Sequence, residues 1–157
     1  MKLTRLFITG VITALVLSGC AANQGTPAGA QQQGEINEAI QAFEDICLET
    51  APSFAGAAQA AASFGILEIK DAGFMKMGSN ANRSLGVQIK AENECAVTTP
   101  SQPDSQLTRQ FLQAVGRHAG AAPRKRVPTK AYVRGVPFMF HHDRQGGEAF
   151  VMLKADK

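Results

Sequence analysis

The sequence lacks the short motifs that mark the commonest enzyme classes. It contains no Gly-x-Ser-x-Gly or Ser-x-x-Lys nucleophile motif, no phosphate-binding loop, no Gly-x-Gly-x-x-Gly turn and no His-Glu-x-x-His zinc motif. These absences remove the most frequent routes to hydrolase, nucleotide-binding and zinc-protease chemistry. They do not exclude an enzyme that uses other residues.

A long apolar run is missing as well. The mostly apolar stretch from Leu6 to Leu17 has twelve residues, which rise about 18 Å as a helix, well short of a hydrocarbon core of ~30 Å. Lys2 and Arg5 precede this stretch, and small residues follow it. This order of charged, apolar and small residues is typical of a cleaved signal peptide and disfavours a permanent transmembrane helix.

The segment Leu17-Ser18-Gly19-Cys20 directly follows the apolar stretch and resembles the lipobox of bacterial lipoproteins. The resemblance covers residues 1–20 and implies removal of residues 1–19 and acylation of Cys20, which becomes a lipid-bearing N-terminus. By this resemblance Cys20 carries three acyl chains, which form a strong bilayer anchor. In lipoproteins of enteric bacteria, an Asp directly after the lipidated Cys favours the inner membrane. Ala21 stands at this position, so the resemblance implies an outer-membrane lipoprotein of a Gram-negative envelope that faces the periplasm.

Residues 20–34 are expected to form a tether. Residues 21–34 carry no charge and no large apolar side chain, and a flexible chain of this length has an r.m.s. reach of about 20 Å. The net charge of +3 includes Lys2 and Arg5, so the processed chain is nearly neutral. We therefore expect a signal peptide over 1–19, a lipidated tether over 20–34 and one folded domain over 35–157.

Besides Cys20 the chain has two cysteines, Cys47 and Cys95. Spare cysteines of an exported chain most simply pair, and closing a loop of roughly fifty residues would stabilise the fold by about 4 kcal/mol. The chain has no Cys-x-x-Cys redox motif, and two cysteines alone are a poor metal site. We expect a structural disulfide that joins Cys47 in a helix to Cys95 in a strand.

Hydrophobic periodicity predicts an α+β domain. An apolar stripe through Ile36, Ile40, Phe43 and Cys47 predicts a helix over 35–50. A second helix is expected over 53–64, with Gly65 as its C-terminal stop and an apolar side formed by Phe54, Ala58, Ala61 and Phe64. A third helix is expected from about 105 to 118, with Asp104 or Ser105 as its cap.

Alternation of apolar and polar residues predicts strands over 85–89, 95–99, 131–141 and 148–155, and a short fifth strand fits 66–70. Pro137 cannot donate to a strand ladder, so its strand is expected to be an edge or to be bulged. The expected order is α-α-β-β-α-β-β, with an antiparallel sheet of four to five strands covered on one face by about three helices.

His141 and His142 form the one histidine pair of the sequence. Neighbouring side chains on a strand point to opposite faces, so the pair cannot share a metal unless the strand has ended. A site that also uses Asp143 and His118 is the metal alternative, and a polar strand end is the simpler interpretation. We expect no metal, no cofactor and no assignable catalytic residue.

Charge is distributed unevenly along the chain. Residues 21–69 contain six acidic side chains and no Lys or Arg, whereas residues 105–142 contain no acidic side chain and seven basic ones: Arg109, Arg117, Arg124, Lys125, Arg126, Lys130 and Arg134. One interpretation is that the acidic first helix faces the basic half within the fold, or that both are simply solvated. The other is a basic face, centred on Arg124, Lys125 and Arg126, for an anionic partner.

These features predict a non-enzymatic binding or scaffold module that is anchored to the bilayer through Cys20 and uses its sheet or its basic loop. An anionic envelope component or a protein is the expected partner, and nucleic acid is not expected at this location. A small envelope hydrolase or an enzyme inhibitor is one alternative. Another is a carrier that holds an apolar ligand between residues 53–64 and the sheet, against the methionines Met75, Met77, Met139 and Met152.

Overall fold

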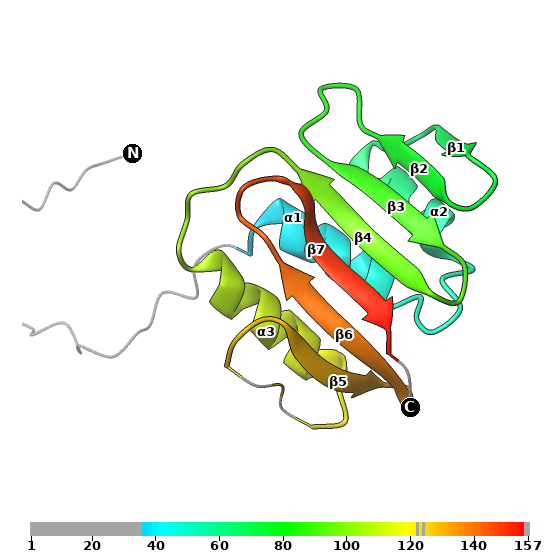
Figure 1. Ribbon diagram of the computed structural model, residues 1–157. Helices are drawn as coiled ribbons and strands as arrows, with labels where there is room; N and C mark the ends of the chain where they lie inside the picture. Colours follow the sequence, from blue (N-terminus) through cyan, green and yellow to red (C-terminus); the bar gives the residue numbers. More distant parts are fainter. Residues whose placement is uncertain (1–35, 122, 124, 156–157) are drawn as a thin grey trace, which may run out of the picture. The chain divides into compact units, whose positions relative to one another are not determined.

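The fold is a single antiparallel sheet with helices on one side. The structure is a computed structural model that describes residues 36–121, 123 and 125–155, which lie in one compact unit. Seven strands form the sheet in the order β1-β2-β3-β4-β7-β6-β5, and Figure 1 shows α1, α2 and α3 on the same side of it. The predicted α+β class, antiparallel sheet and three helices are confirmed.

The number and order of strands were predicted wrongly. The element order is α-α-β-β-β-β-α-β-β-β, and the bounds of the strands are β1 Ile69–Asp71, β2 Lys76–Ser79, β3 Gly86–Lys90, β4 Glu94–Thr99, β5 Thr129–Val133, β6 Val136–His142 and β7 Gly147–Lys154. Two short strands at one edge, β1 and β2, replace the single strand expected over 66–70. The strand expected over 131–141 is the hairpin β5–β6.

The β5–β6 turn has an unusual sequence for its geometry. Arg134 and Gly135 have φ angles of +48° and +81°, as a two-residue hairpin turn requires. Asn or Asp before Gly is the common signal for such a turn, and Arg134 does not provide it.

β6 lies between β5 and β7 and is therefore an interior strand, so the expected edge or bulge at Pro137 is wrong. Pairing with β7 begins only at Phe138, so the missing N–H of Pro137 costs little.

The three predicted helical regions are present in modified form. The first consists of α1 (Glu38–Phe43) and a π-helical continuation, η1 (Glu44–Leu48). The side chain of Asn37 caps α1 by accepting a hydrogen bond from the Ala39 N–H at 3.0 Å. The stripe residues of this helix are buried except Ile36, which is 47% exposed.

The second helical region begins later than predicted, as α2 (Ala57–Ala61) followed by the 3₁₀ turn η2 (Ala62–Phe64). Phe54 has a φ angle of +56°, which is incompatible with a helix over 53–56. In this second helical region Phe54, Ala57 and Ala61 are buried, whereas Ala58 is exposed. Gly65 ends it in the left-handed conformation, as predicted.

The third helix, α3 (Leu107–His118), lies close to its predicted bounds. The Asp104 carboxylate accepts a hydrogen bond from the Gln106 N–H at 2.8 Å, just before the helix begins. None of the helices in the described part of the chain is long and apolar enough to span a membrane.

The core lies between the helices and the centre of the sheet. The ring of Phe43 on α1 contacts Phe111 on α3 and Phe150 on β7, with ring centroids 5.1 and 6.3 Å apart. The predicted disulfide is present: Cys47 on η1 is bonded to Cys95 on β4, with 5.5 Å between their Cα atoms. The bond fixes the first helical region to the sheet.

Candidate functional site

The predicted basic loop is only partly described. Cys20 and Arg124 lie outside the described residues, whereas Lys125 and Arg126 are exposed in the segment that joins α3 to β5. The structure therefore shows two accessible cations in the segment that leads into β5, an edge strand of the sheet.

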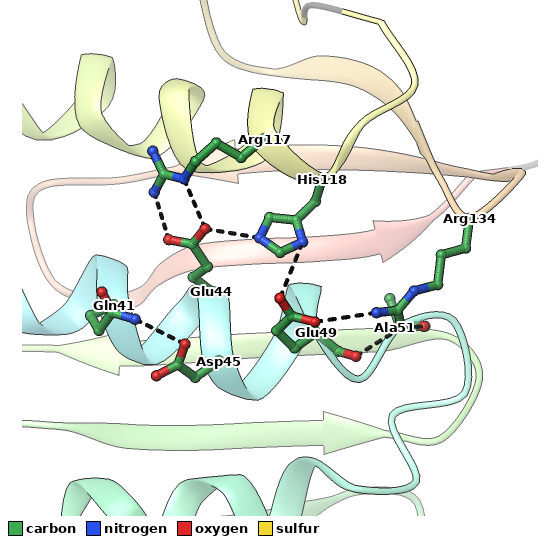
Figure 2. A network of polar contacts seen from close by, with 8 residues as sticks. All are labelled: Gln41, Glu44, Asp45, Glu49, Ala51, Arg117, His118 and Arg134. Carbon is green, nitrogen blue, oxygen red and sulfur yellow. Dashed lines mark hydrogen bonds and ion pairs between the residues drawn. The ribbon is translucent and has the colours of Figure 1, made fainter.

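Other basic residues of the same half are used within the fold (Figure 2). Arg117 donates to both carboxylate oxygens of Glu44, from Nε at 2.9 Å and from Nη2 at 2.6 Å, and His118 Nε2 lies 2.8 Å from Glu44 Oε1. The Glu44 side chain is 12% exposed. Burial raises the pKa of Glu44, but hydrogen bonds from Arg117 and His118 outweigh burial and lower it.

A second acidic residue of the first helical region extends this contact. Glu49 Oε2 is 3.3 Å from Arg134 Nη2 and Glu49 Oε1 is 3.8 Å from His118 Nδ1. Arg134 Nη1 also donates to the carbonyl oxygens of Glu49 and Ala51, so the β5–β6 turn caps the end of the helical region. The interpretation that the acidic helix faces the basic half within the fold is confirmed for Arg117 and Arg134.

The two consecutive histidines point to opposite sides of β6. His142 lies on the helix side, stacked on Phe150 with ring centroids 4.6 Å apart, and its Nδ1 is 2.9 Å from Thr108 Oγ1. Burial lowers the pKa of His142. His141 is exposed on the other side.

The metal alternative that combined these residues with His118 is wrong. Thr108, which contacts His142, and His118 lie ten residues apart on α3, which corresponds to about 15 Å along a helix. His118 contacts Glu44 and Glu49 instead. Among the residues that the structure describes, no group of three His, Cys, Asp or Glu side chains is placed to hold a metal ion.

The sheet face opposite the helices is the most distinctive surface, and the strand register fixes which side chains lie on it. Met139 on β6 pairs with Lys130 on β5 and with Leu153 on β7, and Tyr132 pairs with Pro137. One row further, His141 pairs with Val151. We call the apolar members of these rows the open-face patch: Tyr132, Pro137, Met139, Val151 and Leu153.

The open-face patch is accessible although it is apolar. Tyr132 is 53% exposed, and Pro137, Met139 and Leu153 are partly exposed, whereas Val151 is covered by its neighbours. Directly paired side chains on an antiparallel sheet lie within about 5 Å of one another, so the patch is continuous across three strands. Sequence alternation alone did not reveal it, because it depends on the register in which β5, β6 and β7 pair.

The β1–β4 half of the same face carries a hollow of about 410 Å³. We call it the polar hollow, and its lining residues are Glu68, Lys70, Met77, Gly78, Ser79, Val87, Gln88 and Thr98. The hollow differs from the open-face patch in combining polar side chains with the apolar residues Met77 and Val87.

A second hollow, of about 360 Å³, lies on the helix side between residues 53–58 and the β1–β2 hairpin. Met75 lines it together with Phe54, Phe74 and Ile89. The other three methionines of the carrier alternative lie elsewhere, because Met152 is fully buried in the core and Met77 and Met139 face the open side. The four methionines therefore do not line one ligand cavity.

The sequence and the structure were compared with known proteins, and no relative was found. No family model, no curated protein and no solved structure matches this chain.

Proposed function

We propose that this protein is a lipid-anchored lipoprotein of the bacterial envelope that binds a protein partner through the open-face patch and has no catalytic role. The observation that carries the proposal is the continuous apolar surface on a sheet face that none of the described helices covers (Figure 1). Exposed apolar patches rimmed by polar residues are typical of protein interaction sites.

The surroundings of the open-face patch favour a partner with an acidic margin. Lys130 and His141 flank the patch on the strands themselves. The exposed Lys125 and Arg126 lie just before β5, separated from it by two residues, and Tyr132 lies on that strand. An apolar centre with a basic margin is complementary to an apolar surface flanked by carboxylates, which a protein can offer.

The helix side of the sheet supports such a role by holding the patch in place. The disulfide joins the first helical region to β4, and Arg134 joins the turn between the two outermost patch strands to the end of that region. A preformed surface loses less conformational entropy on binding than a mobile one. The arrangement therefore suits a rigid binding face.

The proposed anchor places this surface near a membrane. Acylation of Cys20 and a tether over 20–34 would keep the domain within roughly 20 Å of the bilayer, in the periplasm at the outer membrane. Partners at this location are other envelope proteins, so recognition of nucleic acid has no place in the proposal.

Crosslinking mass spectrometry of the lipidated protein in native envelopes tests the proposal. We expect one dominant partner whose crosslinked peptides contain apolar residues beside Asp or Glu. The variant Tyr132→Glu should lose this partner, and the variant Arg124→Glu/Lys125→Glu/Arg126→Glu should reduce it, because each changes the patch or its margin.

The matched control is Ile36→Glu. Ile36 is exposed to a similar extent and precedes α1, outside the patch, so the partner should be retained. A partner captured equally by the native protein and by Tyr132→Glu would contradict the proposal.

A further inference from the structure

A glycine on β3 makes room for one of the side chains that line the polar hollow. Ser79 on β2, Gly86 on β3 and Thr98 on β4 pair directly across the sheet. A Cβ atom at Gly86 would lie 2.4 Å from Thr98 Oγ1 and 3.0 Å from the Gly78 carbonyl oxygen. The absence of a side chain at Gly86 therefore leaves room for the hydroxyl of Thr98, which lines the hollow.

Polar side chains that converge on the hollow have no partner within the described part of the chain. The side chains of Ser79, Gln88 and Thr98 make no hydrogen bond to any described residue, and Lys70 makes neither a hydrogen bond nor an ion pair there. A hydroxyl and an amide group each donate and accept hydrogen bonds. These groups are free to bind a ligand that does both.

The charge and apolar content of the hollow narrow the chemistry of that ligand. The carboxylate of Glu68 balances the ammonium of Lys70, so the hollow favours a ligand without net charge. Met77, which is 39% exposed, offers an apolar surface beside the hydroxyl and amide groups. A sugar ring has hydroxyls that donate and accept and a C–H face that packs on an apolar side chain.

We propose that the polar hollow binds a neutral carbohydrate, such as a short segment of a glycan strand. The ring would pack on Met77 while its hydroxyls bond to Gln88, Thr98 and Ser79. A volume of about 410 Å³ lies in the range of small-molecule sites. This site is separate from the open-face patch and does not depend on the partner proposed above.

The test is binding of the full-length protein to an array of neutral oligosaccharides that includes N-acetylglucosamine oligomers and hexose oligomers. The best ligand is then titrated while the Gln88 side-chain amide is followed by NMR. We expect saturable binding that shifts this signal. Gln88→Leu and Thr98→Val keep side-chain volume and remove hydrogen bonds, and each should weaken binding about tenfold.

Two controls separate this site from the rest of the molecule. Gln113→Leu makes the same change at an exposed position of α3 and should leave the affinity unchanged. Tyr132→Glu should also leave it unchanged, which distinguishes failure at the hollow from failure at the open-face patch. The proposal is overturned if no neutral glycan binds, or if Gln88→Leu and Thr98→Val bind as tightly as the native protein.

Discussion

At the scale of single residues, Glu44 joins the two halves of the charge pattern. Its carboxylate receives two hydrogen bonds from Arg117 and contacts His118, so one acidic side chain connects η1 to the end of α3 (Figure 2). Positive side chains in the last turn of a helix are also favourable to the helix dipole. We therefore expect Glu44 to contribute to stability more than its neighbours on the same helix.

Glu44→Gln should lower the free energy of unfolding by about 1 kcal/mol, because an uncharged amide has one acceptor oxygen and can keep only one of the two hydrogen bonds from Arg117. The loss is modest because Arg117 is 48% exposed and solvent screens the pair. Urea unfolding measures the change. Asp45→Asn is the matched control, since the one side-chain hydrogen bond of Asp45 within the described residues comes from Gln41 on the same helical region, and its effect should stay within about 0.5 kcal/mol. Equal losses for the two variants would contradict this account of Glu44.

His142 predicts a pH dependence with a definite sign. Burial lowers its pKa in the folded state from the ordinary value of 6.5, Arg144 lowers it further and Asp143 partly offsets the effect. The unfolded chain therefore takes up a proton at a higher pH than the folded protein does. Stability from this residue is complete above pH 6.5 and is lost as the pH falls through the lowered pKa.

The measurement is the melting temperature from pH 8 downward for the native protein and for His142→Phe, which keeps the ring stacked on Phe150 but does not titrate. The native protein should lose more stability than the variant as the pH falls below His142's ordinary pKa of 6.5. Parallel pH profiles would show that His142 does not contribute. Glu44, whose pKa is lowered from 4.5, adds a further loss in both proteins at lower pH.

At the scale of secondary-structure elements, the β5–β6 hairpin is the feature that sets the sheet order near the open-face patch. Gly135→Ala should cost about 1 kcal/mol, because Gly135 has a φ angle of +81° that a residue with a Cβ adopts unfavourably. A Cβ at this position meets no atom within 4 Å, so the cost comes from the backbone alone. Thermal unfolding measures it.

Gly120→Ala provides the comparison. A Cβ at Gly120, like one at Gly135, would meet no atom within 4 Å, but Gly120 does not have a left-handed backbone conformation. Its substitution should leave the melting temperature nearly unchanged. Similar losses at Gly120 and Gly135 would show that the backbone conformation of the turn is not the cause.

The elements that the sequence predicted well are those whose pattern is local. Strand β3 follows from the alternation over residues 85–89, and α3 from the hydrophobic periodicity that begins after Asp104. The Cys47–Cys95 disulfide followed from the number of cysteines. Short elements were missed where the signal is weak, as in β2, where Gly78 interrupts the alternation.

The open-face patch and the polar hollow were beyond the reach of the sequence for a different reason. The patch lies on β5, β6 and β7 and the hollow on β1 to β4, so each depends on the register in which consecutive strands pair. An alternating strand shows that one side is buried, but not which residues of another strand lie next to it. The pairing of Met139 with Leu153 therefore becomes visible only in the register of the sheet.

At the scale of the whole molecule, the two sides of the sheet have different roles in this account. The helix side contains the aromatic core, the disulfide and the contacts of Glu44 and Glu49, and it stabilises the fold. The other side offers an apolar patch toward β5 and a polar hollow toward β1. An acylated Cys20 and its tether would hold both surfaces close to envelope components.

Site-specific photo-crosslinking in intact cells tests the central claim most directly. A photo-reactive amino acid is placed at Tyr132 on the open face and, in a second strain, at the exposed Gln113 on the helix side. We predict one discrete protein adduct from position 132, reduced when Lys125 and Arg126 are replaced by Glu, and none from position 113. The absence of an adduct at position 132, or the same adducts from both positions, would contradict the assignment of the open-face patch as a protein-binding surface.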